Sequence, residues 1–355
     1  MKVLSLFDGI SCGMVALERA GIKVDRYVAY EIDKYAIQVS EKNYPQIEHK
    51  GDVFDANFKE YKGFDLLIGG SPCTYWSIAR NNREVTPDGI GGQLFMQYKR
   101  ALDESGCKYF LYENNYSIHQ NIKEFISEQL GVQPIMINSA LVSAQNRKRC
   151  YWTNIPGVEQ PEDKGILLND ILENAVGWHD KSYCMTASYS KAVLHNSLKR
   201  NQRTMVAVPV YGAAQRGHYK ENGSTEQHIE IRNDEKSNCL TTVQKDSLIC
   251  KPVRIGEYGK GGQAQRIYSV RGKSVTLSAN GGGQGAKTGL YKIDLPDGDY
   301  IIRKLTPIEA ERLQTLPDNY TAGISNTQRY KCIGNGWTVD VIAHIFKHLK
   351  DEDEE

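Results

Sequence analysis

Cys73, Glu31 and Glu113 are the side chains whose types and positions best suit them to chemistry. Each follows an apolar run that predicts a buried strand, and these runs are residues 64–68, 27–30 and 108–112. The carboxyl ends of parallel strands meet at one edge of a sheet, where open α/β folds hold their ligands. We therefore expect the three groups to converge on one rim.

Cys73 lies in the turn-rich stretch GGSPCTYWSIAR, residues 69–80, behind a proline and two glycines. A lone cysteine in a tight loop is often a small buried hydrophobic group. A lone carboxylate at a strand end is often only a surface charge. Those structural interpretations stay open until the rest of the chain is considered.

The amino-terminal segment predicts a nucleoside-binding unit. An apolar run at residues 3–7 is followed by DGISCG, residues 8–13, and by apolar residues at helical spacing that end at Gly21. Such a turn presents backbone N–H groups and a helix amino end to a ligand. Glu31 can accept hydrogen bonds from ribose hydroxyls, and Asp52 can accept one from an exocyclic amine. These features fit nicotinamide, flavin and adenosyl cofactors alike.

The segments after Cys73 predict a flap, further strands and a packed final helix. Residues 81–93 are polar and rich in glycine, as suits a mobile flap, and a helix should run from 94 to 104. A strand is expected at 134–142. An apolar helical stripe near the carboxyl end should pack on the first domain, and its members are Val339, Ile342, Ile345, Phe346 and Leu349.

The stretch SAQNRKRCYW places polar side chains on one face of an extended segment. Gln145, Arg147 and Arg149 occupy alternate positions, which share a face in a strand. Arginines on one face can bind a phosphate or a carbonyl oxygen. A solvated, charged edge strand is the alternative.

Bulk composition limits the setting. The 355 residues carry a net charge of +1 and suffice for one large core and a smaller second domain. No run approaches the roughly 18 apolar residues of a membrane span and no signal peptide is evident, so we expect a cytoplasmic protein without membrane contact. The cysteines include no CxxC pair, which predicts neither a metal site nor a disulfide framework.

Residues 178–300 differ in character from the rest. Between Trp178 and Ile293 there are 18 Lys and Arg against 8 Asp and Glu, a local charge of +10. This segment is rich in glycine and contains short related segments that recur, which predicts small β units. The basic charge favours a polyanionic partner such as nucleic acid, and a purely structural insertion is the alternative. Residues 351–355 are all acidic and predict a solvated tail.

Taken together, the motifs resemble those of the cytosine-5 DNA methyltransferase family, in the family's order and over nearly the whole chain outside 178–300. They are LSLFDGISCG, YEID (30–33), GDV, GGSPC, YEN (112–114), QNRKR (145–149), LTPIEAERLQTLPDNYT (305–321) and IGNGWTVDVI (333–342). The residue sequences of these motifs look most like those of the mammalian de novo branch, and we expect a bacterial or phage member. Asn115 and the pair Gly336–Trp337 depart from the small apolar residues usual in the family.

The resemblance implies a Rossmann-like α/β fold with a mainly parallel sheet and a smaller β-rich target-recognition domain. Residues 1–177 and 301–350 would form the catalytic domain, and 178–300 the recognition domain. S-adenosylmethionine would be the methyl donor, with S-adenosylhomocysteine as product. The residues implied for its pocket are Phe7, Asp8, Gly9, Ile10, Ser11, Gly13, Glu31, Ile32, Asp52, Val53, Leu94, Asn335, Gly336 and Trp337.

Matching positions also imply the catalytic roles. Cys73 would be the nucleophile, Glu113 would protonate or hydrogen-bond cytosine N3, and Arg147 and Arg149 would support Glu113 and the flipped base. Cytosine C5 is a poor nucleophile, so a thiolate must first add at C6 to form an enamine. A free thiol has a pKa near about 8.5, so loop amides and arginine charge should favour the anion. The base that later removes the C5 proton is not identified.

The implied partner is double-stranded DNA, because the target atoms are inaccessible until the cytosine is flipped out. A cognate restriction endonuclease is a further partner that the family suggests. The candidate DNA contacts are Ser77, Gln145, Arg216, Arg266 and Arg271, since such side chains bind the DNA backbone or read base edges.

Alternatives of other classes remain. A catalytically silent DNA-binding relative is disfavoured by the intact Cys73, Glu113 and Arg147. An RNA cytosine-5 methyltransferase is disfavoured by the long basic segment. A nicotinamide oxidoreductase is least favoured, because the glycine turn lacks a full GxGxxG.

Overall fold

The computed structural model describes residues 1–77, 82–210, 213–219, 225–231, 254–257, 266–268 and 299–349. By the contacts within each part, the chain divides into two units. Unit 1 comprises residues 1–171, 181–191 and 306 onward, and unit 2 comprises residues 172–180 and 192–305. Residues 181–191, expected in the second domain, belong to unit 1 because their backbone pairs with the segment before strand β7 and their Tyr189 packs on Tyr330.

A seven-stranded sheet forms the centre of unit 1, in the order β3-β2-β1-β4-β5-β7-β6. Neighbouring strands pair in parallel except at β7, which runs antiparallel to both β5 and β6. The strands are β1 Lys2–Leu6, β2 Arg26–Tyr30, β3 Glu48–His49, β4 Leu66–Gly69, β5 Tyr109–Asn115, β6 Ile135–Asn138 and β7 Lys148–Thr153. The predicted α/β fold with a mainly parallel sheet is confirmed.

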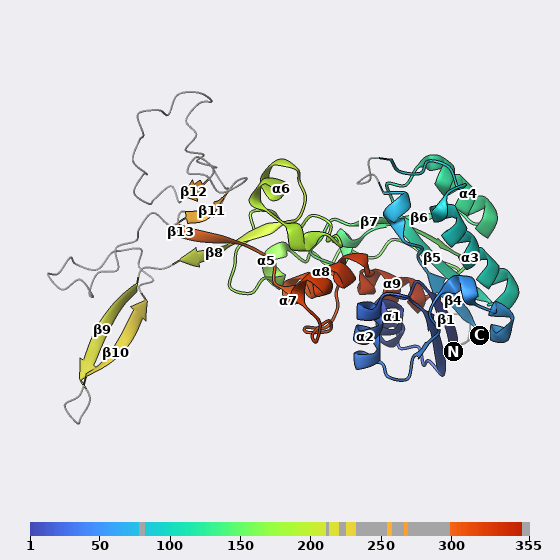
Figure 1. Cartoon of the computed structure of the whole chain (residues 1–355), viewed down its shortest axis with the longest axis horizontal. Helices are drawn as coiled ribbons and strands as arrows, with labels where there is room; N and C mark the ends of the chain where they lie inside the picture. Colours follow the sequence, from blue (N-terminus) through green and yellow to red (C-terminus); the bar gives the residue numbers. More distant parts are fainter. Residues whose placement is uncertain are drawn as a thin grey trace. The chain divides into compact units, whose positions relative to one another are not determined.

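Helices cover both faces of this sheet (Figure 1). One face packs on α1 Cys12–Ala20, α2 Lys34–Asn43 and α9 Val339–Lys347, and the other on α3 Ile90–Ser105 and α4 Gln120–Leu130. Strand β4 is buried throughout, and β1 is buried after Lys2 and apolar there except at Ser5, because both faces of these strands are covered. The predicted stripe of α9 is confirmed, since each of its members is buried.

Short helical elements complete unit 1. They are η1 Val53–Asp55, η2 Phe58–Tyr61, η3 Cys73–Tyr75, η4 Ser139–Leu141, η5 Tyr189–Lys191, α5 Leu168–Ile171, α7 Pro307–Leu313 and α8 Asn326–Asn335. Within the described residues, no helix combines the length and the apolar character needed to cross a membrane.

Helix α3 begins at Ile90, inside the segment that the sequence predicts as a flap. The carboxylate of Glu84 accepts hydrogen bonds from the backbone N–H groups of Ile90 and Gly91, at 3.1 Å each. A negative charge at a helix amino end stabilises that end. This contact forms because the loop that contains Glu84 folds back onto the start of α3. Hydrophobic periodicity gives no indication of such a fold. Residues 78–81 of the expected flap lie outside the described residues.

Unit 2 is rich in antiparallel β pairs. Strand β8 Met205–Val210 pairs with β13 Asp299–Lys304, β9 Ala213–Tyr219 with β10 Thr225–Ile231, and β11 Arg254–Glu257 with β12 Arg266–Tyr268. Helix α6 Leu194–Lys199 precedes them. Its Leu194 is buried against Met205, with Trp178 and Ile302 packed alongside.

A buried carboxylate organises the motif at residues 305–321. Glu311 is fully buried and accepts hydrogen bonds from the backbone N–H groups of Asn319 (2.7 Å) and Thr321 (2.8 Å). Arg329 of α8 forms an ion pair with it at 2.8 Å. Glu311 therefore fixes the turn after α7 and joins α7 to α8.

We expect Arg329→Leu to lower the free energy of unfolding by about 3–5 kcal/mol, because it leaves the charge of Glu311 buried without its ion pair. Urea denaturation measures this change. The matched control is Asp318→Asn, which breaks an exposed ion pair to Arg312 and should cost about 0–1 kcal/mol. Equal, small losses in both variants would contradict a structural role for the buried pair.

Candidate functional site

An open cleft lies at the carboxyl edge of the parallel strands in unit 1. Its wall includes the turn after β1, the ends of β2 and β5, the loop after β4, β7, and the segment after α8. The structure brings Glu31 and Glu113 to this one cleft, as expected from their strand ends. Pro72 and Thr74 line it too. Between them the backbone of Cys73 begins η3, and its side chain lies outside the described part of the chain.

The turn after β1 is strained and internally fixed. Phe7 and Ser11 have positive φ angles of 58°, a region that side chains other than glycine rarely adopt. The carboxylate of Asp8 holds the turn, accepting hydrogen bonds from the hydroxyls of Ser5 and Tyr27 at 2.6 Å each and from Ser11 at 2.5 Å. Asp8 therefore shapes the cleft with oxygens that are already engaged.

Glu31 connects that turn to the end of β2. Its Oε2 accepts a hydrogen bond from Gly9 N at 2.8 Å, and its Oε1 accepts from Ile32 N (2.9 Å) and Asp33 N (2.8 Å). Burial raises the pKa of this carboxyl group, and the backbone N–H groups oppose the rise. A carboxylate has about four acceptor sites, so about one remains for a ligand hydroxyl.

The predicted cofactor residues divide into two sets. Those that line the cleft are Phe7, Asp8, Gly9, Ile10, Glu31, Asn335, Gly336 and Trp337. The others lie behind or beside its wall. Ser11 is buried against Asp8 and Ser40, Gly13 faces Ile68 and Tyr27, and Val53 is a core residue.

The remaining members of the second set are more exposed. Asp52 accepts a hydrogen bond from Phe54 N at 3.0 Å and so caps η1. Leu94 is half-buried on α3, and Ile32 is 72 % exposed. A cofactor contact by these residues stays a prediction.

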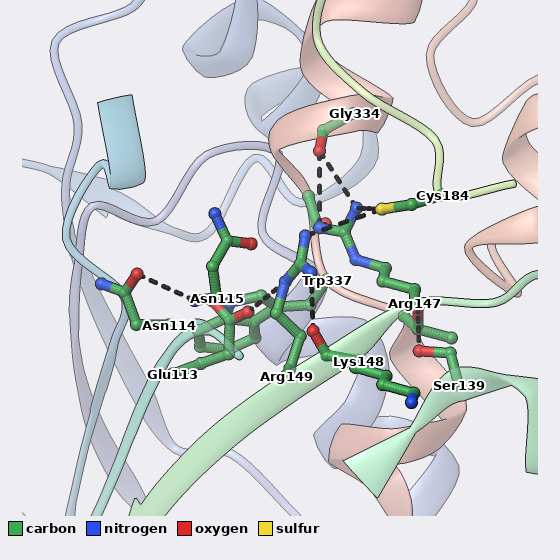
Figure 2. Close-up of polar contacts among 12 residues, drawn as sticks. Glu113, Asn114, Asn115, Ser139, Arg147, Lys148, Arg149, Cys184, Gly334 and Trp337 are labelled. Atoms are coloured by element: carbon green, nitrogen blue, oxygen red, sulfur yellow. Dashed lines mark hydrogen bonds and ion pairs between the residues drawn. The ribbon is translucent and has the colours of Figure 1, made fainter. Parts of the chain in front are cut away.

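Glu113 is held from two sides (Figure 2). Arg149 Nε lies 2.8 Å from its Oε1, and the indole Nε1 of Trp337 donates to its Oε2 at 3.1 Å. The antiparallel direction of β7 explains the first contact. Parallel strands end at this edge of the sheet whereas β7 starts there, and Arg149 pairs with Asn115 in the ladder. The second contact comes from the segment after α8.

The loop that carries Cys73 is anchored on β5. Ser71 Oγ and Tyr112 OH are hydrogen-bonded at 2.6 Å, and Asn114 Nδ2 donates to Ser71 O at 3.3 Å and to Tyr112 OH at 3.2 Å. All three side chains are buried. The Glu-Asn motif thus sends one side chain into the cleft and uses the other to fix the neighbouring loop.

Arg147 lines the cleft, but its guanidinium is bound to backbone carbonyl oxygens. It is only 4 % exposed, and its guanidinium donates to Met185 O (2.9 Å), Gly334 O (3.4 Å) and Gly336 O (2.8 Å). A positive charge here also suits the carboxyl end of α8. Arg149 is the arginine that reaches Glu113, and Arg147 holds the segments around it.

Gln145, expected to contact DNA, is instead buried inside unit 1. It is fully buried, donating to Leu313 O (2.5 Å) and Gln314 Oε1 (2.8 Å), while its own oxygen accepts from Met185 N (3.1 Å). A side chain without exposed surface has no access to DNA. The alternation of residues 145, 147 and 149 is real, but that face is covered by residues 181–191 and the segment after α7.

The other candidate DNA contacts stay predictions. Ser77 is half-buried. Arg216 lies on β9 and Arg266 on β12, strands whose backbone course is described and whose side chains are not. Arg271 lies outside the described residues.

Cys184 is a feature that the sequence did not single out. Its sulfur lies 3.6 Å from Arg147 Nη1 and 3.9 Å from Arg149 Nη2 (Figure 2). Burial alone would raise the pKa of its thiol, but the two guanidinium charges outweigh burial and lower it. In contrast, burial raises the pKa of Cys12 and of Cys332 to about 12. No periodicity or spacing marks this site, because it forms only when residues 181–191 pack on β7.

Comparison with known proteins agrees with this architecture. A family model described as C-5 cytosine-specific DNA methylase matches residues 1–351. The type II methyltransferase M.HhaI of Haemophilus parahaemolyticus is 28 % identical over 361 residues, covering 97 % of this chain and 93 % of that protein. The orphan methyltransferase M.SPRI of Bacillus phage SPR is 26 % identical over 439 residues, covering 98 % and 97 %.

Solved structures share the fold. The Entamoeba histolytica methyltransferase EhMeth has a TM-score of 0.62 at 16 % identity, covering 100 % of this chain and 99 % of that one. The Dnmt2 methyltransferase of S. pombe has a TM-score of 0.53 at 15 % identity, with 99 % of each chain covered. At these identities the likeness concerns the fold alone.

We expect the thiol of Cys184 to become an anion at a lower pH than an ordinary cysteine. Peptide-resolved alkylation of the folded protein across a pH series would place its midpoint at a lower pH than that of an unperturbed cysteine thiol. Arg149→Met removes one of the charges that lower the pKa, so the midpoint should move to higher pH. Cys332 is the internal control and should stay unreactive at neutral pH. An unchanged midpoint in Arg149→Met would contradict the electrostatic explanation.

Proposed function

Because this chain belongs to the C-5 cytosine-specific DNA methylase family, we propose that it methylates carbon 5 of cytosines in double-stranded DNA. Relatives that match nearly the whole chain are named type II and orphan methyltransferases. The observation that best supports the proposal is the 2.8 Å pair of Glu113 and Arg149 in the cleft that the Cys73 loop also lines. When it carries a proton, a carboxyl group held in this way can donate a hydrogen bond to N3 of a flipped cytosine.

We propose S-adenosylmethionine as the methyl donor, and one part of the cleft wall suits a positively charged nucleoside. Phe7 and Trp337 contribute aromatic rings to its wall, and Glu31 and Asp33 contribute carboxylates. Aromatic faces and carboxylates both attract cations. Glu31 retains about one acceptor site for a ribose hydroxyl. When bound, the donor supplies an electrophilic methyl group on its sulfonium.

Cys73 supplies the nucleophile in this proposal. Its sulfur bonds to cytosine C6, and the displaced electron pair collects at N3 and C5. Glu113 gives a proton or a hydrogen bond at N3, which stabilises that pair, and Arg149 holds Glu113 in place. The Arg149 and Glu113 side chains are only 13 % and 12 % exposed, so water weakens their attraction less than at a surface.

The end of the reaction releases the enzyme. Once C5 carries its methyl group, a base takes the C5 proton. The sulfur of Cys73 then leaves C6 with the electron pair of the S–C6 bond. The anchoring of Ser71 by Tyr112 and Asn114 suits this chemistry, because it fixes the loop backbone that leads to Cys73.

We assign target recognition to unit 2. The residues of unit 2 between Trp178 and Ile293 hold 16 Lys and Arg against 8 Asp and Glu, a charge of +8, and basic surfaces bind the DNA backbone. Antiparallel pairs such as β9 and β10 can place side chains in a groove of duplex DNA. A cognate restriction endonuclease is proposed only by analogy with the relatives named type II methyltransferases.

We expect a denaturation-resistant complex between this protein and duplex DNA that contains 5-fluorocytosine, because the C5 fluorine blocks the final proton loss and traps the S–C6 bond. Protein, S-adenosylmethionine and DNA are incubated and then separated by denaturing electrophoresis. Cys73→Ser should abolish the complex. Cys184→Ser should retain it and serves as the matched control.

The opposite pattern would assign the nucleophile to Cys184. A wild-type protein that binds donor and varied DNA but forms no complex would support the catalytically silent alternative. A complex formed only with RNA that contains 5-fluorocytosine would support the RNA alternative.

A further inference from the structure

The indole of Trp337 has a definite polar partner in the cleft. Its Nε1 donates to Glu113 Oε2 at 3.1 Å, and Arg149 Nε forms an ion pair with Oε1 at 2.8 Å. Figure 2 shows Trp337 and Arg149 on the same carboxylate. A carboxylate with a donor on each oxygen is restrained from rotating about its Cγ–Cδ bond.

Trp337 is itself held by buried polar contacts on both sides. The carbonyl of Gly336 accepts hydrogen bonds from Arg147 Nη2 (2.8 Å) and Gln314 Nε2 (3.1 Å). On the other side, Thr338 Oγ1 donates to Gln314 Oε1 at 2.8 Å. The backbone of Trp337 is therefore fixed without help from Glu113. The indole N–H is thus a preorganised donor.

The loop before Cys73 packs directly against this contact. A Cβ at Gly70 would lie 3.0 Å from Glu113 Oε2 and 3.5 Å from Trp337 Nε1, and 2.9 Å from the carbonyl oxygen of Glu113. Only glycine leaves that space free. The Cys73 loop, Glu113 and Trp337 thus meet at one tightly packed point of the cleft.

We propose that Trp337 is a positioning residue for the base-binding half of the site, orienting Glu113 toward cytosine N3 through its indole N–H as well as lining the cleft. The inference rests on the proposed function, since it assigns Glu113 to the cytosine ring. It predicts that Trp337 contributes to activation of the base even when no methyl donor is present.

Exchange of the C5 hydrogen reports that activation separately from methyl transfer. The Cys73 sulfur bonds to C6, the ring pair moves to N3 and C5, and C5 takes a proton from water. C5 then loses its original hydrogen to a base, and the sulfur leaves with the S–C6 electron pair. With tritium at C5 the products are unlabelled cytosine and tritiated water, and nothing is oxidised or reduced.

The test compares wild type with Trp337→Phe on duplex DNA tritiated at cytosine C5. The variant keeps an aromatic ring and loses the N–H. We expect about a 10-fold lower tritium release without donor, the effect of losing one hydrogen bond to a charged group. Turnover at saturating S-adenosylmethionine should fall by the same factor, and the donor KM should change less.

A second variant separates the hydrogen bond from packing. Site-specific replacement of Trp337 by 3-benzothienylalanine keeps the bicyclic shape and puts sulfur in place of the N–H. We expect its exchange rate to be as low as that of Trp337→Phe. The control is Tyr44→Phe, which removes a hydrogen bond of 2.7 Å from an aromatic side chain to Glu18, neither residue lining the cleft, and should leave exchange unchanged.

A wild-type rate in the benzothienyl variant would overturn the proposal. An effect confined to the donor KM, with saturated turnover and exchange unchanged, would also overturn it, because Trp337 would then act only as a wall of the donor site. A wild-type protein that methylates no cytosine would instead overturn the proposed function, and this inference with it.

Discussion

The site depends on holding one carboxylate, Glu113, in a fixed orientation where little water can reach it. The side chain is only 12 % exposed, so protein donors must replace lost hydration. They come from Arg149 and Trp337, on opposite sides of the carboxylate and far apart in the sequence. The antiparallel strand β7 is what makes the first donor available, because it starts at the edge of the sheet where β5 ends.

The second donor depends on a buried arginine. Arg147 ties the carbonyls of Gly334 and Gly336, at the end of α8, to the segment that contains Met185. A guanidinium with several carbonyl partners is satisfied when buried and adds a favourable charge at a helix carboxyl end. That arrangement fixes Trp337 on the cleft. The proposed base-binding carboxylate and the proposed donor-binding wall are therefore joined by a single indole ring.

Local patterns predicted much of the fold and part of the site. Apolar runs located the strands that bring Glu31 and Glu113 to one cleft, and helical spacing located the stripe of α9, because both signals follow from burial of a repeating face. What the patterns missed depends on contacts between distant segments. The early start of α3 needs Glu84, the burial of Gln145 needs residues 181–191, and the role of Trp337 needs Glu113 opposite it. None of these leaves a periodic trace in the sequence.

We propose that this cleft makes 5-methylcytosine in DNA. The most direct measurement is mass spectrometry of nucleosides from duplex DNA of varied sequence, after incubation with purified protein and S-adenosylmethionine carrying a deuterated methyl group. We expect deuterated 5-methylcytosine with the wild type and none with Glu113→Ala, although that variant should still bind the donor. Label on adenine, on cytosine N4 or on no base at all, from a protein that binds both donor and DNA, would contradict it.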